Sequence, residues 1–204
     1  MLNLASQSVV ITGANRGLGL ALSQVAAEAG AHVVLTSRDP SGAATVAAEL
    51  SRRGWHAEAY ASPLDVSNEG HVRDFGRFCE EHALPDILIN NAAVCETGWT
   101  GEVIERTLAT NVLGPLSLMR MLLPTMRKRR RPRVINLSSG DGELVYLSTS
   151  LQTQMSSVTD EEQLLTLLER IAPPRDEFGG VKNPPAHGPT PAYTLSNVSR
   201  GCSQ

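Results

Sequence analysis

A strand, a glycine-rich turn and a helix follow one another without a break near the start of the chain. Residues 8–12 read SVVIT, a β-branched run that predicts a buried strand. Residues 13–19 read GANRGLG, and apolar side chains then recur at helical spacing as far as Ala29, before Gly30. A helix that begins in such a turn presents free backbone N–H groups and a positive dipole end to an anion. This order of elements therefore predicts a turn that binds the phosphates of a dinucleotide.

Each glycine of this turn has its own steric role. Gly13 allows the tight turn, Gly17 lets the backbone approach a pyrophosphate, and Gly19 lets the helix pack closely on the strand. Three spaced glycines are weak evidence by themselves. Their position between a strand and a helix is the one that a dinucleotide-binding fingerprint requires, and it makes the prediction strong.

Strands and helices alternate after this turn. Apolar runs predict further strands over residues 32–36, 57–61, 85–90 and 133–137. Helices are expected between them, over residues 40–54 with an Asp39 N-cap before Pro40, over 67–81 with Ser67 as the cap, and over 102–130. Such alternation implies right-handed βαβ units. We therefore expect the α/β class, a Rossmann-like doubly wound parallel sheet in a single domain over residues 1–204.

Composition and charge exclude several classes of protein. The 204 residues include 18 basic and 21 acidic ones, and a net charge of −3 excludes a chain whose main task is to neutralise nucleic-acid phosphates. A hydrophobic content of 41% excludes a wholly disordered chain. No apolar stretch is long enough for a membrane span and no secretory signal is recognisable. Three scattered cysteines, Cys79, Cys95 and Cys202, indicate free thiols in the cytoplasm, and no metal site is expected.

Two further segments stand out by their charge. The run 127–133 reads RKRRRPR, which we interpret as a solvated helix end, with a nucleic-acid or nuclear-localisation patch as the alternative. Residues 141–192 differ in composition from what precedes them and are read as an insertion. Within it, a capping box at residues 159–162 predicts a short amphipathic helix over about 160–171, between extended flanks.

The glycine spacing TGxxxGxG and the motifs that follow it resemble the short-chain dehydrogenase/reductase family over residues 8–200. The matching segments are Thr12–Gly19, Asp65–Val66, Asn90–Ala93 with alanine in place of a glycine, Asn111–Gly114, Ser138–Ser139 and Tyr193. Ser139 and Tyr193 lie 54 positions apart, and a long insertion there is similar to the monomeric carbonyl reductases. The resemblance implies a monomer. The chain departs from the family pattern in ending before the usual C-terminal strands, so we expect a sheet truncated after its fifth strand. The helix at about 160–171 would cover the surface through which other members pair.

The resemblance also implies the site residues and a small-molecule carbonyl substrate. Cofactor-binding residues would be Thr12, Gly13, Asn15, Arg16, Gly17, Leu18, Gly19, Arg38, Asp65, Val66, Asn91 and Ala92. Tyr193 would be the acid/base, Ser139 would bond the substrate carbonyl, and Asn111 would order a proton-relay water. The family's lysine, four residues after the tyrosine, is replaced here by Asn197.

The end of the second strand indicates which cofactor is preferred. It reads Thr36-Ser37-Arg38, without the carboxylate that holds a ribose 2′-hydroxyl in NAD-preferring proteins. Arg38 and Arg16 could pair with a 2′-phosphate, so NADP(H) is expected, and two solvated surface arginines are the alternative. The chain is thus read as an NADPH-dependent carbonyl reductase-like oxidoreductase. A catalytically impaired NADP-binding remnant is an alternative, because Asn197 cannot supply the charge of a lysine. A truncated fragment is another, because the family's C-terminal strands have no counterpart in the sequence.

Overall fold

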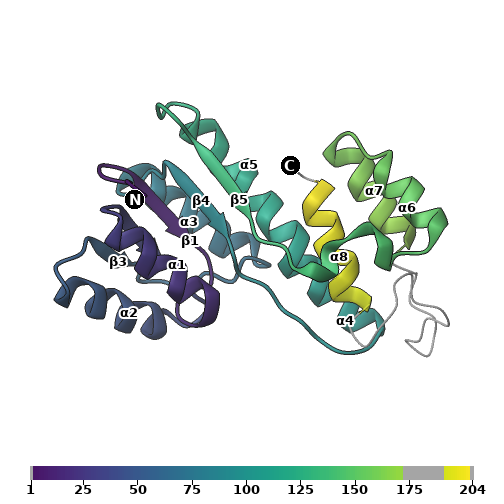
Figure 1. The fold of residues 1–204 in the computed structure, drawn as a ribbon, viewed down its shortest axis with the longest axis horizontal. Helices are drawn as coiled ribbons and strands as arrows, with labels where there is room; N and C mark the ends of the chain where they lie inside the picture. The colour runs from purple at the N-terminus through teal and green to yellow at the C-terminus, as the bar shows by residue number, and fades with distance from the viewer. Residues whose placement is uncertain (1, 172–190, 203–204) are drawn as a thin grey trace. The chain divides into compact units, whose positions relative to one another are not determined.

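The computed structural model describes residues 2–171 and 191–202, which fall into two compact units (Figure 1). Unit 1 comprises Met1–Ala92 and Gly114–Leu137, and unit 2 comprises Ala93–Leu113 and Ser138–Gln204. Among the described residues, none of the helices combines the length and apolar character that a membrane crossing needs.

Unit 1 is a five-stranded parallel sheet, as the alternating pattern predicts, and the structure gives its strand order as β3-β2-β1-β4-β5. The strands are β1 (Ser8–Ile11), β2 (His32–Leu35), β3 (Ala57–Ala59), β4 (Ile87–Asn90) and β5 (Arg133–Asn136). The helices are α1 (Gly17–Glu28), α2 (Pro40–Arg52), α3 (Glu69–Glu81) and α5 (Gly114–Met126). The Rossmann-like α/β fold class is thereby confirmed.

Helices cover both faces of this sheet, which is why its central strands are continuously apolar. Alternate residues of each strand point to opposite faces. Val9 and Ile11 of β1 belong to the core formed with α1 and α2. Val10, between them, belongs to the core formed with α3 and α5, where Phe75 is fully buried.

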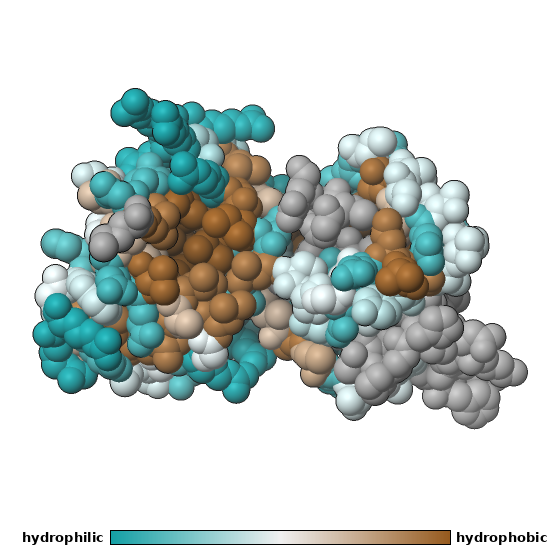
Figure 2. All heavy atoms as spheres, in the orientation of Figure 1, coloured by the Kyte–Doolittle hydropathy of each residue, from teal (hydrophilic) through white to brown (hydrophobic). Residues whose placement is uncertain are grey.

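Strand β5 lies at one edge of the described sheet, as β3 does at the other, and two of its four residues are exposed. Its Ile135 is 41% exposed, and Val25 of α1 is 54% exposed. Figure 2 shows apolar side chains gathered on the side of unit 1 where α1 and β5 lie. This side of the unit therefore presents apolar surface to solvent.

Unit 2 is helical. It contains α4 (Gly101–Leu108), a π-helical turn η1 (Ala109–Leu113), and the short 3₁₀ turns η2 (Gly140–Gly142) and η3 (Leu144–Tyr146). The helices α6 (Thr149–Ser156), α7 (Glu161–Ile171) and α8 (Pro191–Cys202) complete it. Helix α7 lies where the capping signal predicts a helix. Helix α6 and the two 3₁₀ turns correct the expected extended flank before it, and most of the flank after it lies outside the described residues.

The long helical region expected over residues 102–130 is observed from Gly101 to Met126, but it is not one regular helix, because η1 separates α4 from α5. A π-helical turn arises where one extra residue widens a helix, often to satisfy a local polar demand. Here the side-chain amide of buried Asn111 bonds both the N–H and the carbonyl oxygen of Val94. That tertiary bond takes precedence over regular helix geometry.

Two helix caps are displaced by one residue from their predicted positions. Asn68, not Ser67, caps α3, and its Oδ1 accepts from the His71 N–H at 3.1 Å. At α7 the capping box is formed by Asp160 and Gln163. Asp160 Oδ1 accepts from the Gln163 N–H at 2.9 Å, and the Gln163 side chain accepts from the Thr159 N–H.

Candidate cofactor-binding and catalytic residues

The glycine turn of unit 1 has the steric features that its sequence predicts. Gly13 and Gly17 adopt φ values of 65° and 55°, in the left-handed region that favours glycine. A Cβ at Gly19 would lie 2.3 Å from the Gly13 carbonyl oxygen, so only glycine fits there. At Gly17, by contrast, an added Cβ would meet none of the described atoms within 4 Å. The turn is therefore tight at its base and open at Gly17.

Helix α1 begins at this open point without a side-chain cap. Its N-cap residue, Arg16, makes no capping hydrogen bond, whereas Asp39, Asn68 and Thr100 cap α2, α3 and α4 through their side chains. The N–H groups of the first turn of a helix have no partner within the helix. An uncapped N-terminus beside an open glycine turn fits an anionic group such as a pyrophosphate.

Thr12 and Asn91 hold the turn against the end of β4. The Asn91 and Ala92 N–H groups donate to Thr12 Oγ1 at 3.0 and 2.9 Å. Asn91 Nδ2 donates to the carbonyl oxygens of Thr12 and Gly13 at 2.8 and 3.2 Å. These side chains fix the shape of the turn, and this brace is a role that the motif alone does not reveal.

The end of β2 presents positive charge. Thr36 and Ser37 are buried and Arg38 is exposed. The adjacent Asp39 is occupied as the cap of α2: its Oδ1 accepts from Ser41 N at 3.0 Å and Ser41 Oγ at 2.7 Å, which lowers the pKa of its carboxyl group. Within the described part of the chain, neither Arg16 nor Arg38 forms an ion pair. Both guanidinium groups can therefore pair with an anion.

Four other candidate residues lie in unit 1, and three of them have local structural contacts. Asp65 Oδ1 accepts from Ser67 N at 3.0 Å and from Ser67 Oγ at 2.6 Å. Val66 packs against the start of α5, where a Cβ on Gly114 would lie 2.7 Å from its Cγ2. Asn15 lies beside Gly42 of α2, and Leu18 is 59% exposed in the first turn of α1.

The candidate catalytic residues all lie in unit 2, around α8. Asn111 is fully buried in η1; its Oδ1 accepts from the Val94 N–H at 2.8 Å, and its Nδ2 donates to Val94 O at 2.8 Å. The same Nδ2 donates to Ser196 Oγ of α8 at 3.0 Å. Asn111 therefore ties the strand-following segment at Val94 to the helix that carries Tyr193.

Tyr193 and Asn197 lie one helical turn apart on α8. Asn197 is 1% exposed, and its Nδ2 donates to the Tyr193 carbonyl oxygen at 3.1 Å. Ser138 Oγ donates to the Asn197 carbonyl oxygen at 3.2 Å, and Ser139 Oγ accepts from the Asp141 N–H at 3.0 Å as the cap of η2. The segment after β5 and helix α8 are thus held together within this unit.

Ser138 and Ser196 are structural members of this group to which the sequence analysis assigns no role. Each bonds a neighbour of a candidate catalytic residue, Ser138 at Asn197 and Ser196 at Asn111. Ser196 is fully buried on a helix whose neighbouring Leu195 is also fully buried. A serine at an apolar position of a helical pattern is the signal in the sequence that could have predicted a buried hydrogen bond.

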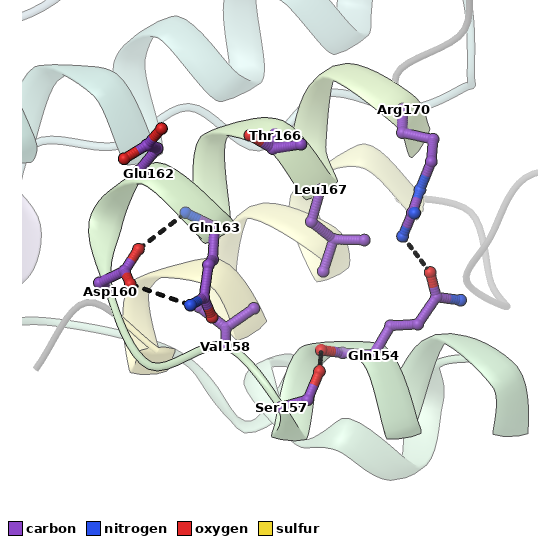
Figure 3. A pocket seen from close by; sticks show the side chains of 9 residues that line it. All are labelled: Gln154, Ser157, Val158, Asp160, Glu162, Gln163, Thr166, Leu167 and Arg170. Atoms are coloured by element: carbon purple, nitrogen blue, oxygen red, sulfur yellow. Dashed lines mark hydrogen bonds between the residues drawn. The ribbon is translucent and has the colours of Figure 1, made fainter.

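A pocket of about 500 Å³ in unit 2 lies between α6 and α7 (Figure 3). Its polar groups bond one another. Gln163 bonds Asp160 through N and Nε2, each at 2.9 Å, and Arg170 donates to the Gln154 side chain (Figure 3). The polar side chains of this pocket thus cap α7 and join α7 to α6, and no chemistry is assigned to the pocket.

Comparison with known proteins gives the family. The short chain dehydrogenase family matches residues 7–151. The chain is 33% identical over 148 residues to the ketoacyl reductase HetN of Nostoc sp., covering 70% of this chain and 51% of that protein. It is 35% identical over 139 residues to retinol dehydrogenase 12 of Bos taurus, covering 67% and 44%. The chain therefore spans about half the length of these curated relatives.

Solved structures share the fold. A metagenomic short-chain oxidoreductase in complex with NADP is 27% identical, with a TM-score of 0.69, covering 97% of this chain and 72% of that one. Menthone neomenthol reductase from Mentha piperita is 23% identical, with a TM-score of 0.83, covering 96% and 82%. Because the family match covers residues 7–151, more than half of its length, the chain belongs to the short-chain dehydrogenase family.

Proposed function

We propose that this chain binds NADP(H) in preference to NAD(H) and acts as a carbonyl reductase-like oxidoreductase on a ketone, aldehyde or quinone. The observation that carries the cofactor preference is the end of β2, where Arg38 is exposed and Asp39 is occupied by Ser41. An arginine can bond a 2′-phosphate bidentately, whereas a carboxylate would repel it. NADP in complex with the metagenomic oxidoreductase, a 27% identical family member, supports this choice.

The roles of the chain's own residues follow from their chemistry. The uncapped start of α1 and the open backbone at Gly17 would hold the pyrophosphate, with Arg16 and Arg38 at the 2′-phosphate. Asp65, Val66, Asn91 and Ala92 would border the rest of the cofactor. Bound NADPH would supply a hydride. We assign carbonyl polarisation to Ser139 and proton donation to Tyr193, which carries the proton to the product oxygen. Asn111, with its amide bonded to Val94 and Ser196, is a positioning residue.

Asn197 makes reduction the favoured direction. Carbonyl reduction needs a protonated tyrosine, which a neutral side chain supplies, whereas alcohol oxidation needs tyrosinate as a base. A cation near the tyrosine would favour tyrosinate, and an asparagine amide provides no charge. The Asn197 amide also bonds the Tyr193 carbonyl oxygen instead of a ligand, which supports the second candidate function, an NADP-binding remnant without turnover.

We further propose that the chain acts as a cytoplasmic monomer and a single NADP-binding domain over residues 1–204, with 141–192 as an insertion. Free Cys79 and Cys95 support a reducing compartment. Helix α7, with Leu164, Leu167 and Leu168 buried, supports a packed insertion. Light scattering should show a monomer, and a discrete dimer or tetramer would contradict this assignment.

The direct test combines cofactor titration with turnover. Purified protein should quench or shift NADPH fluorescence at lower concentrations than NADH requires. NADPH consumption with a quinone should be measurable and should be abolished by Tyr193→Phe. Binding without consumption in the wild type would favour the remnant, whereas consumption that persists in Tyr193→Phe would overturn the catalytic assignment.

A further inference from the structure

A pocket of about 390 Å³ lies in unit 1 at the N-terminal ends of the strands. It is lined by Ala5, Ser6, Gln7, Asp86, Arg130, Arg131 and Arg133. The segment 5–7 leads into β1, Asp86 precedes β4, and Arg133 opens β5. Because these strands are parallel, the glycine turn that follows β1 lies at the opposite edge of the sheet. The pocket is therefore separate from the candidate cofactor site.

Positive charge is concentrated at this pocket. Residues 127–133 hold six basic side chains in a chain whose net charge is −3, and no acidic residue occurs between Thr107 and Gly140. Figure 2 shows hydrophilic side chains gathered at the end of unit 1 where α5 ends and β5 begins. A helix dipole acts only on charges within the last turn. Stabilising the end of α5 therefore does not account for the whole run.

The one acidic group that lines the pocket already has its partners. Asp86 Oδ2 accepts from the Ser8 N–H at 2.9 Å, and its two oxygens accept from Arg129 at 2.8 and 2.7 Å. Arg129 does not line the pocket. Among the described residues, the three arginines that do line it form no ion pair. Their guanidinium groups are therefore available to an external anion.

The arginines sit on a turn that is fixed at both ends. The bidentate pair between Arg129 and Asp86 fixes the turn after α5. The Arg133 N–H donates to the Asp86 carbonyl oxygen at 2.9 Å as β5 begins. Only Arg130, Arg131 and the conformationally restricted Pro132 lie between these two points. A ligand would therefore meet partly preorganised donors, which lowers the entropy lost on binding.

The wall of the pocket also contains an uncommon backbone conformation. Ser6, with φ of 65°, is the one non-glycine residue with positive φ in the described part of the chain. Such conformations are rare for residues with a Cβ and concentrate at ligand-binding and switch regions. Ser6 lines the same pocket as the unpaired arginines, and its conformation is an observation independent of the charge.

From these features we propose that the pocket binds a small ligand carrying two or more linked phosphate groups. Arginine forks match phosphate oxygens bidentately, and three of them in one pocket favour more than one phosphate. The volume is that of a small-molecule site. No aromatic side chain lines the pocket, so it offers no surface on which a nucleic-acid base could stack.

Backbone amide shifts give a test that locates the ligand. Inorganic tripolyphosphate added to ¹⁵N-labelled protein should shift the amides of Ser6, Gln7, Arg131 and Arg133. The double variant Arg130→Glu/Arg131→Glu should weaken this binding by about tenfold or more, because two charge-assisted contacts are lost. The control Arg52→Glu/Arg73→Glu makes the same change of charge on exposed positions of α2 and α3 and should alter the affinity less than about twofold, since it removes no direct contact.

Several outcomes would overturn the proposal. One is a set of shifts confined to the glycine turn, and another is equal weakening by the two double variants. Duplex DNA or phosphatidylglycerol vesicles that bind through the same arginines, without competition from tripolyphosphate, would assign the surface to a macromolecule or membrane instead. Competition by tripolyphosphate at residues 6–7 and 130–133 would support the small-ligand site.

Discussion

The side-chain amide of Asn197 donates to the carbonyl oxygen of Tyr193, one turn earlier on α8, at 3.1 Å. A side chain bonded back to its own helix is held away from other partners. Asn197 is also 1% exposed, and its backbone oxygen accepts from Ser138. The position four residues after the candidate proton donor therefore has a structural role in this chain.

Replacing this amide by a cation should change the balance between the two directions of reaction. Asn197→Lys should raise alcohol oxidation more than carbonyl reduction, because a cation about 4 Å from the phenol stabilises tyrosinate by up to about 4 kcal/mol at an effective dielectric constant of about 20. Steady-state rates with NADP and an alcohol, and with NADPH and a quinone, measure both directions.

The control for this change is Asn197→Met, which fills similar space without charge. Both variants lose the bond to Tyr193 O, so loss of packing should affect them alike, as urea unfolding will show. Equal rates in the lysine and methionine variants would contradict the electrostatic explanation. If Asn197→Lys raised kcat equally for oxidation and for reduction, the expected larger effect on oxidation would be contradicted.

Arg38→Asp should reduce or reverse the preference for NADPH. A hydrogen bond to a charged group contributes about 1.5–3 kcal/mol, so NADPH affinity should fall by about tenfold to a hundredfold while NADH affinity holds or rises. Fluorescence titration with both cofactors measures the ratio. Arg52→Asp, an equal change of charge on α2, is the control. A ratio unchanged by Arg38→Asp would remove the basis for NADP selection.

Gly19→Ala should destabilise unit 1 even though alanine is the better helix former. The new Cβ would lie 2.3 Å from the Gly13 carbonyl oxygen, and a backbone atom cannot move aside as a side chain can. We expect a loss of about 3 kcal/mol in the free energy of unfolding, measured in urea.

Gly54→Ala separates steric overlap from backbone strain. Gly54 has φ of 82°, and an added Cβ there would meet no described atom within 4 Å, so strain alone should cost about 1–2 kcal/mol. If Gly19→Ala were no more damaging than this variant, the tight packing of the turn would be refuted.

Stability should fall in alkali because of Cys79. Burial raises the pKa of its thiol to about 12, with smaller contributions from Glu80 and Glu58, while the thiol of the unfolded chain titrates near 9. The unfolded state therefore releases a proton from about pH 9 upward and the folded state does not. The contribution is complete below pH 9 and declines above it, by at most about 1.4 kcal/mol per pH unit, until the folded thiol also ionises.

Urea unfolding of wild type and Cys79→Ala between pH 8 and pH 10.5 isolates this contribution. The alanine variant starts less stable, because a buried side chain has been shortened, but its stability should decline less steeply above pH 9. Parallel profiles for the two proteins would show that the thiol is not the group responsible.

The sequence predicts the sheet well because its signal is local. Most strands are short apolar runs, and their alternation with helices predicts a parallel sheet. The choice of helix caps is not local in the same way. Ser67 and Asn68 can both cap α3, and Asn68 does so because the Ser67 hydroxyl is bonded to Asp65.

The site was only partly predictable for the same reason. The glycines of the turn can be recognised from their spacing in the sequence. The bond between Thr12 and Asn91, however, joins residues that follow two different strands, β1 and β4. The π-helical turn at Asn111 depends on a hydrogen bond to Val94, and such a contact leaves no periodic pattern in the sequence. Helix α6 escaped prediction because only Leu151 and Met155 are buried on it, too few for an amphipathic pattern.

The partly covered strand β5 has a consequence for how this protein behaves at high concentration. A strand at a sheet edge with an exposed apolar side chain, here Ile135, is a template on which another polypeptide can add. The arginines that precede it in the chain give every copy the same charge at this point and so oppose pairing between copies. Salt weakens such repulsion, since the screening length falls from about 10 Å at 0.1 M to about 3 Å at 1 M. We therefore expect association between copies to be weak in dilute buffer and to increase as the salt concentration rises.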